Sequence, residues 1–177
     1  MTIIEPLARA ALLAAALACE PAWADPSVRI GARGGVELAD AADPSAGVDL
    51  RLAFSKSPLT INPTFDYVFD ANRTLYEVSI NALYDLPVSL GRAAPYVGIG
   101  ADVTSFTFKQ VTQGVDNGGN RLGMNLVAGA CFDFPIASPF IQIVKQIGEL
   151  DPLSFGAGFV VALDSDPRWT GCGRRTR

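Results

Sequence analysis

The most regular feature of the chain is an alternation of apolar and polar side chains, clearest in residues 74–86. One set of alternate positions holds Thr74, Tyr76, Val78, Ile80, Ala82 and Tyr84, and the other holds mostly polar residues, interrupted by Leu75 and Leu83. A period of two places successive side chains on opposite faces of a strand. This segment is therefore predicted to be a β-strand with two unlike surroundings.

The same alternation recurs in short segments along the rest of the chain. Turn-forming residues separate eight such segments, at 40–44, 56–58, 70–73, 87–94, 109–120, 134–138 and 148–152. Beyond the N-terminus, no apolar run reaches the roughly 18 residues of a membrane-spanning helix. The pattern predicts an all-β fold, and an even strand number fits an antiparallel up-and-down barrel.

Two strands carry exceptions to the pattern. In the seventh, Lys145 shares a face with Ile141, Ile143 and Ile147, so its span and register stay open. In the third, Pro63 has no N–H for the sheet, and a bulge or local kink is expected there.

Two barrels fit such strands, and they are inside-out versions of each other. A soluble lipocalin-like barrel turns its apolar face inward, whereas an outer-membrane barrel turns it toward lipid. Glycine distinguishes them, because the lumen of eight strands is wide enough only for packed side chains. The polar face contains Gly31, Gly35, Gly98, Gly100, Gly123, Gly129, Gly156 and Gly158. The polar face is therefore predicted to line the lumen of a transmembrane barrel.

Charged residues within the strands support that orientation. Facing lipid, a basic residue near the mid-membrane costs roughly 2–4 kcal/mol and an acidic one somewhat less. Inside, arginines and carboxylates can pair. The predicted luminal charge network comprises Arg29, Arg33, Glu37, Asp49, Arg51, Asp66, Glu77, Asp102 and Asp133. Such a network either plugs the barrel or lines a narrow, porin-like ion path, and the small diameter favours the plug.

Aromatic residues on the apolar face fall near predicted strand ends. Aromatic side chains favour the two membrane–water interfaces. The expected girdle comprises Phe54, Tyr67, Phe69, Tyr76, Tyr84 and Phe132.

The first 24 residues have the form of a secretory signal peptide. Arg9 precedes an Ala- and Leu-rich run too short to span a bilayer, and Ala22-Trp23-Ala24 resembles a cleavage site. The expected division is a signal peptide at 1–24, a barrel at 25–163 and a polar tail at 164–177. After cleavage Cys131 and Cys172 remain, and whether they pair is left open.

Composition narrows the range of functions. The net charge is −4 and charged residues make up 18% of the chain, so nucleic acid is not an expected partner. The absence of histidine removes Ser-His and Cys-His catalytic arrangements and the usual zinc sites. No cofactor, metal or enzymatic activity is expected. Ser79 with Asp102 is the one serine–carboxylate pairing considered as an alternative.

Two passages resemble a known family. Residues 81–87 (NALYDLP), followed by residues 94–100 (APYVGIG), are similar to the strand–turn–strand passage of small eight-stranded outer-membrane β-barrels: OmpA-like domains, OmpX-like proteins and opacity-type surface proteins. Ser154, Gly156, Phe159 and Val161 resemble the terminal-strand signal read by the barrel assembly machinery. Members usually end on an aromatic residue closing the last strand, whereas this chain continues into a tail.

The resemblance implies a location and a topology. It implies the outer membrane of a Gram-negative bacterium, contact with its lipid, both termini in the periplasm, and outward loops at 39–45, 70–73, 109–120 and 148–152. The expected function is a non-enzymatic structural or surface-interaction role, with no specified extracellular partner. A narrow ion-conducting pore and a soluble lipocalin-like binder remain the alternatives.

Overall fold

The structure is a computed structural model that describes residues 26–38, 42–54, 57–88, 90–109, 118–134, 136–148, 151–163 and 172. The predicted signal peptide, most of the loop at 109–120 and nearly all of the tail lie outside these residues, so the three-part division stays a prediction. Within the described ranges, no helix is long and apolar enough to cross a membrane.

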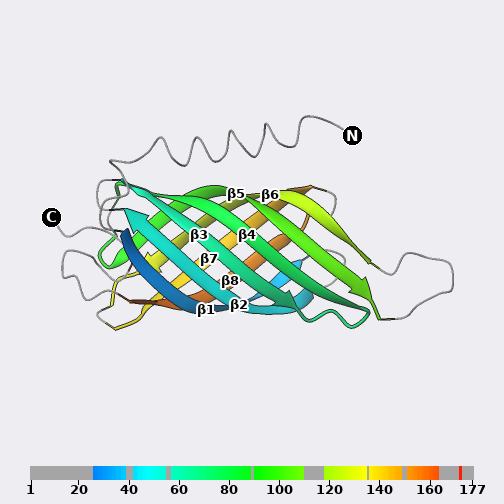
Figure 1. The fold of residues 1–177 in the computed structure, drawn as a ribbon. Coiled ribbons are helices and arrows are strands. Elements are labelled where there is room, and N and C mark those ends of the chain that lie inside the picture. Colours follow the sequence, from blue (N-terminus) through cyan, green and yellow to red (C-terminus); the bar gives the residue numbers. More distant parts are fainter. Residues whose placement is uncertain are drawn as a thin grey trace, which may run out of the picture.

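Eight antiparallel strands close into a barrel, each pairing with the next in sequence and β8 pairing with β1. They are β1 (Pro26–Leu38), β2 (Ala42–Phe54), β3 (Leu59–Val68), β4 (Arg73–Asp85), β5 (Ala93–Phe108), β6 (Gly118–Phe132), β7 (Ser138–Gly148) and β8 (Leu153–Ala162). Figure 1 shows them wrapping obliquely around one axis. The predicted eight-stranded up-and-down barrel is confirmed.

The barrel has two distinguishable ends. β1 begins and β8 finishes at the same end, where the Leu163 N–H donates to the Val28 carbonyl oxygen at 2.9 Å. The β2–β3, β4–β5 and β6–β7 turns lie at this end, which we call the termini end. The other four connections lie at the opposite end, which we call the loop end (Figure 1).

The apolar face of the sheet points outward. Along β4, Val78 and Ile80 are 53% and 57% exposed, whereas Ser79 and Asn81 between them are 3% and 4% exposed. Phe159 on β8 is likewise 49% exposed. The predicted orientation is confirmed, because a lipocalin-like barrel would bury these apolar side chains.

The interior is not uniformly polar. Leu75 and Leu83, which interrupt the polar positions of β4, are buried inside the barrel. Leu83 belongs to an apolar cluster that also contains Tyr96, Val127, Phe140, Val144 and Val160. The strand alternation therefore separates outward-facing from enclosed positions rather than apolar from polar ones.

Several strands are longer than the turn residues indicated. β2 begins at Ala42 and β6 at Gly118, so parts of the expected outward loops 39–45 and 109–120 are strand. β7 keeps Lys145 on the outward face with its isoleucines. Its ammonium reaches the Asp151 carboxylate at 3.1 Å at the loop end, as expected of a long basic side chain near a membrane boundary.

Of the bulge or local kink expected at Pro63, the register excludes the bulge. The β2–β3 register is the same on both sides of it, since Asp49 pairs with Thr64 and Leu52 with Ile61. This register places Leu50 opposite Pro63, which has no N–H to donate. The side-chain amide of Asn62 donates to the Leu50 carbonyl oxygen instead, at 2.8 Å. A side chain thus replaces the missing ladder bond without an inserted residue.

Most luminal glycines lie where atoms of a neighbouring strand approach closely. A Cβ atom at Gly31 would overlap the backbone oxygen of Phe159, and one at Gly129 would lie 2.6 Å from the Tyr96 ring. Gly35, Gly98, Gly100, Gly123 and Gly158 are similarly confined. Gly156 is different, because the nearest atom to a Cβ there would be 3.6 Å away. Crowding explains these glycines except Gly156.

Candidate functional site

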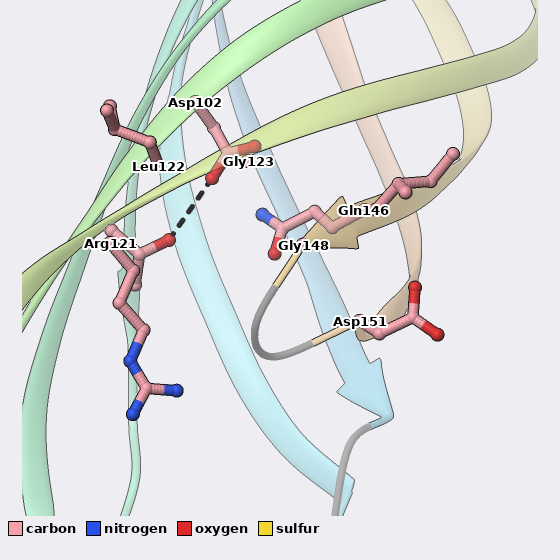
Figure 2. Close-up of a pocket in the computed structure, with 9 residues that line it drawn as sticks. Asp102, Arg121, Leu122, Gly123, Gln146, Gly148 and Asp151 are labelled. Atoms are coloured by element: carbon pink, nitrogen blue, oxygen red, sulfur yellow. Dashed lines mark hydrogen bonds between the residues drawn. The ribbon is translucent and has the colours of Figure 1, made fainter.

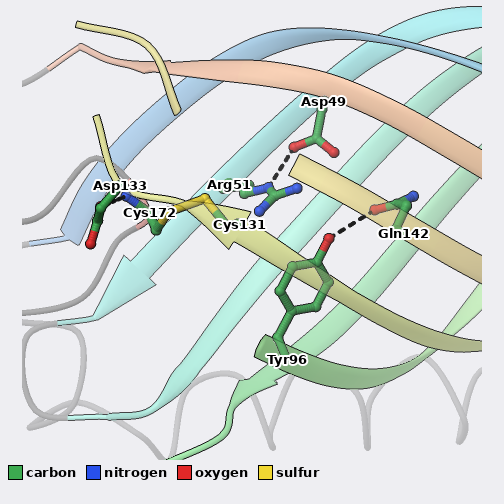
Figure 3. The surroundings of a disulfide bond; sticks show 7 residues. All are labelled: Asp49, Arg51, Tyr96, Cys131, Asp133, Gln142 and Cys172. Atoms are coloured by element: carbon green, nitrogen blue, oxygen red, sulfur yellow. Dashed lines mark hydrogen bonds and ion pairs between the residues drawn. A yellow bond between two sulfur atoms is a disulfide. The ribbon is translucent and has the colours of Figure 1, made fainter. Parts of the chain in front are cut away.

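The candidate site is the filled lumen, and its best-paired group lies toward the termini end. The Arg51 Nε donates to Asp49 Oδ1 at 2.8 Å, and both side chains are buried. The Asn62 amide donates to the same carboxylate oxygen at 3.1 Å. The Arg51 guanidinium also lies 4.3 Å from the centroid of the Phe140 ring and 5.4 Å from that of Tyr96. Figure 3 shows Arg51 with Asp49 and Tyr96. Salt bridge, hydrogen bond and aromatic faces together hold this buried charge.

A second pair crosses the barrel nearer its middle. The Arg33 Nε lies 3.1 Å from Asp66 Oδ1. The Gln142 amide is best oriented with its oxygen 2.9 Å from Arg33 Nη2 and its nitrogen 3.3 Å from the Tyr96 hydroxyl. Arg33 thereby connects Asp66 on β3 to Gln142 on β7 and, through it, to Tyr96 on β5. These links close the cross-section with hydrogen-bonded side chains.

Toward the loop end, Glu77 and Asp102 accept hydrogen bonds from hydroxyl groups. The Ser79 hydroxyl donates to Glu77 Oε1 at 2.9 Å and accepts from the Asn125 amide at 3.1 Å. The Thr104 hydroxyl donates to Asp102 Oδ2 at 3.3 Å. Among the described residues, neither Glu77 nor Asp102 has an arginine or lysine within 4.0 Å. Glu77 and Asp102 are therefore held by neutral groups, unlike Asp66, which is paired with Arg33.

The cavities found among the described residues of the loop half are very small. One of about 20 Å³ is lined by Arg33, Asp66, Glu77 and Asn125, among others. Another, of about 10 Å³, is lined by Asp102, Arg121 and Gln146 from three neighbouring strands (Figure 2). Each is about the volume that a single water occupies. The lumen at these levels is filled by side chains.

A disulfide lies at the termini end. Cys131, on the luminal face of β6, is bonded to Cys172 with a Cα–Cα separation of 5.8 Å. Both cysteines are buried and belong to the apolar cluster with Leu83, Tyr96 and Phe140. The Cys172 N–H donates to the Asp133 carboxylate at 2.8 Å. The pairing that the sequence left open is present, and it fixes one residue of the tail at this end (Figure 3).

The predicted luminal residues take different positions. Arg29 is fully buried near the termini end, and its Nη2 donates to Ser27 Oγ at 2.9 Å. Glu37 is buried at the loop end. Asp133 lies beyond the end of β6, and its observed bond is to the Cys172 backbone rather than to a luminal arginine. The other six residues lie inside the barrel.

Several enclosed residues were missed by the sequence analysis. Tyr96 shares a face with Gly98 and Gly100, so extending that strand by one alternate position would have found it. Phe140, Gln142 and Gln146 lie on β7, whose open register concealed them. Asn125, which shares the polar face of its strand with Gly123 and Gly129, bridges Ser79 and Asn81 and was not recognised in that role.

The aromatic residues gather toward the two ends. Tyr67 contacts Phe69 and Tyr76, with ring centroids 4.8 and 5.3 Å apart, toward the loop end. Tyr84 is exposed and Phe132 partly exposed near the termini end. Phe54 does not meet the expectation, because it is only 8% exposed. It is the last residue of β2, where the chain leaves the sheet.

The residues of the expected terminal-strand signal all lie on β8 but on two faces. Phe159 points outward, and Val161 shares its side of the strand. Ser154 and Gly156 line the lumen. The structure thus places the residues, while their recognition during assembly stays a prediction.

The serine–carboxylate pairing considered from the sequence is adjacent in the structure but not hydrogen-bonded as such. Ser79 and Asp102 are cross-strand partners between β4 and β5, but the Ser79 hydroxyl donates to Glu77. The described residues hold no group of three or more His, Cys, Asp or Glu side chains placed to bind a metal ion.

A comparison with known families decides what the barrel is. The outer membrane protein beta-barrel domain family matches residues 10–136. The chain belongs to this family. Its exposed apolar wall is therefore that of an outer-membrane β-barrel, in agreement with the resemblance seen in the sequence.

Solved structures agree on the fold of this outer-membrane barrel. Neisserial surface protein A is 16% identical, with a TM-score of 0.60 over 77% of this chain and 96% of that one. The N-terminal β-barrel domain of Pseudomonas aeruginosa OprF is 18% identical, with a TM-score of 0.59 over 77% and 99%. No curated protein matches the sequence. At these identities the likeness establishes the fold and leaves the activity open.

Proposed function

We propose that this outer-membrane β-barrel is a non-enzymatic, non-conducting protein with a structural or surface-interaction role, inserted in the outer membrane of a Gram-negative bacterium after cleavage of its first 24 residues. The filled lumen is the observation that carries the proposal. Ion pairs and amide bridges cross it, and the cavities of about 20 and 10 Å³ beside them have room for single waters only. A conducting path needs continuous water, so a plug is favoured.

Membrane insertion is tested by fractionation and gel migration of the full-length protein. The protein is expected in the outer-membrane fraction, with unheated samples migrating differently from boiled ones because a closed barrel resists detergent. Recovery in the soluble fraction with the same migration in both samples would favour a lipocalin-like binder. An N-terminal sequence of the mature protein beginning at Asp25 would support the expected cleavage.

Conductance separates the plug from the pore. The purified protein in planar bilayers is expected to give no current steps above the bilayer baseline. The matched variant Arg33→Ala/Gln142→Ala removes two of the side chains that cross the middle of the lumen and is expected to give small steps. Current steps from the unmodified protein would contradict the proposal and establish the narrow pore.

The non-enzymatic part of the proposal rests on the engagement of Ser79. Its hydroxyl donates to Glu77 and accepts from Asn125, and the sequence has no histidine to activate it. The protein in phospholipid and lipopolysaccharide vesicles is expected to release no fatty acid. Release that is lost in Ser79→Ala would overturn this part and identify the serine as a nucleophile.

A further inference from the structure

The outer wall carries a groove much larger than any cavity described above. It has a volume of about 490 Å³ and lies over β6, β7 and β8. Ala128 and Ala130 on β6 lie beside Ile141 and Ile143 on β7, and Phe155 lies on β8. Small side chains next to large ones leave a depression in an otherwise apolar wall.

The register shows how the groove runs. Ala130 pairs with Ile141, and Ala128 pairs with Ile143, which in turn pairs with Phe155. Ala130 lies two residues before the end of β6 and Ile141 three residues after the start of β7. The groove therefore begins near the β6–β7 turn, at the termini end, and extends from there toward the middle of the wall.

A basic residue lies beyond the groove at the termini end of the barrel. Arg92 is exposed in the β4–β5 turn, directly before Ala93, which pairs with Phe132. Its guanidinium lies 5.2 Å from the centroid of the Phe134 ring, and its carbonyl oxygen accepts the Asp133 N–H at 2.9 Å. Pro95 pairs with Ala130, which lines the groove, and Arg92 precedes Pro95 by three residues. Arg92 is therefore about 10 Å farther toward the termini end than the groove. The Arg92 guanidinium thus lies at the depth expected for phospholipid headgroups.

We propose that the groove and Arg92 form a binding site for one phospholipid of the periplasmic leaflet. One acyl chain lies over Ala128 and Ala130, between the isoleucines and Phe155, and the phosphate meets the Arg92 guanidinium. The groove is continuous with the lipid-facing wall, and a depression in that wall loses dispersion contacts unless a chain fills it. The placement in the periplasmic leaflet follows from the proposed orientation, with both termini in the periplasm, so the inference rests on the proposed function.

Photolabelling in vesicles tests the site. The full-length barrel is inserted in vesicles of phosphatidylethanolamine and phosphatidylglycerol that contain a trace of phosphatidylethanolamine with a diazirine in one acyl chain. After irradiation, labelled positions are mapped by mass spectrometry of peptides. Label is expected to be severalfold more abundant on Ile141, Ile143 and Phe155 than on Val78 and Ile80, which face lipid on β4.

Filling the groove supplies the matched comparison. Ala128→Leu/Ala130→Leu is expected to lower the label on β7 and β8 to the level on β4. Ala101→Leu, which adds equal bulk per site to the exposed wall of β5, is expected to leave the pattern unchanged. Heat-dependent migration confirms that each variant is folded. If the double variant does not fold, the unmodified protein alone tests the proposal. Label concentrated on β7 and β8 supports the site, and label spread evenly over the wall contradicts it.

The headgroup contact has its own readout. Arg92→Gln is expected to reduce severalfold the labelling by the diazirine phospholipid, while labelling by a diazirine fatty alcohol, which has no phosphate, stays the same. If Arg92→Gln leaves labelling by the diazirine phospholipid at the level of the unmodified protein, Arg92 is not part of the site. Even labelling around the wall, or cross-links between two copies in place of lipid, would overturn the proposal. No labelling on any strand would instead show that the barrel had not inserted.

Discussion

The two halves of the lumen hold their charges in different ways. Toward the termini end, Arg51 and Asp49 are paired at 2.8 Å beneath aromatic rings and a disulfide. Toward the loop end, Glu77 and Asp102 are held by hydroxyl groups, beside cavities of about 20 and 10 Å³. An enclosed charge without water needs a partner of opposite sign, whereas one beside a cavity can be hydrated. One barrel thus contains a tightly paired half and a half with room for water.

The largest effect is expected where the tightly paired half loses a charge. Arg51→Ala leaves Asp49 buried without its cation, which typically costs about 3–5 kcal/mol. Urea unfolding in lipid vesicles, followed by loss of the unheated gel band, measures it. Arg51→Met/Asp49→Asn removes both charges and is expected to recover part of the loss. Equal losses in both variants would show that packing, rather than an unpaired carboxylate, is responsible.

Opening the disulfide is expected to have the next largest effect. The bond closes a segment with a sequence separation of 41, and bonds of this kind contribute about 2–4 kcal/mol. The urea midpoint should therefore fall in the presence of reductant. Cys131→Ser/Cys172→Ser should unfold at the lower midpoint with or without reductant. A midpoint that reductant does not move would mean that the apolar cluster alone holds the termini end closed.

Two luminal glycines on neighbouring strands β1 and β8 compare a crowded position with an open one. Gly31→Ala places a methyl group against the Phe159 backbone at the β1–β8 seam and should cost about 1–3 kcal/mol, as overpacking does. Gly156→Ala, where the nearest atom would be 3.6 Å from the new Cβ, should be close to neutral. Urea midpoints of the two variants measure the contrast. Similar losses would show that the space beside Gly156 does not accommodate a methyl group.

A smaller effect is expected from neutralising an acid of the loop half. Glu77→Gln keeps an acceptor for the Ser79 hydroxyl and removes a negative charge from a strand that faces Asp66 on one side. The stability should change by less than about 1 kcal/mol and in the stabilising direction, because like charges repel. The urea midpoint decides. A loss comparable with that of Arg51→Ala would abolish the distinction between the halves.

The smallest effect is expected outside the lumen, at the β3–β4 turn. Burial alone would raise the pKa of Asp70, but hydrogen bonds from the Asn72 and Arg73 backbone and from the Arg73 side chain hold it below the ordinary 3.8. Because the pKa of Asp70 is lower in the folded than in the unfolded protein, ionised Asp70 stabilises the fold at pH values above 3.8, the unfolded pKa. This stabilisation is lost as the pH falls below 3.8 through the pKa of the folded state. Asp70→Asn should therefore unfold more easily at neutral pH, by less than about 1 kcal/mol. If the urea midpoints of Asp70→Asn and the unmodified protein differ as much well below pH 3.8 as at neutral pH, the stabilisation does not come from the ionised carboxylate.

Alternation was sufficient to predict the fold and the orientation of its faces. It depends on local geometry, so Val78 outward and Ser79 inward follow from their neighbours alone. The pairings within the lumen do not follow in this way. Arg33 reaches Asp66 on β3 and Gln142 on β7 only after strand stagger and turn lengths are set.

The remaining misses have specific physical causes. Leu75 and Leu83 face inward because position, not polarity, decides the face of a strand residue. The bulge expected at Pro63 is absent because Asn62 supplies the missing donor from its side chain. The disulfide joins positions that only the closed barrel brings together, so spacing could not establish it.

Because β1 pairs with β8, every strand of the barrel has two neighbours, and the chain is interrupted only between these two strands. Leu163 and Val28 are hydrogen-bonded at 2.9 Å, so a short linker could join the two ends of the barrel without crossing it. New termini could then be opened in the β5–β6 connection, giving the same neighbours in the order β6, β7, β8, β1 to β5. Such a circular permutant would place both termini at the opposite rim, and its ability to insert would show whether assembly requires β8 to come last.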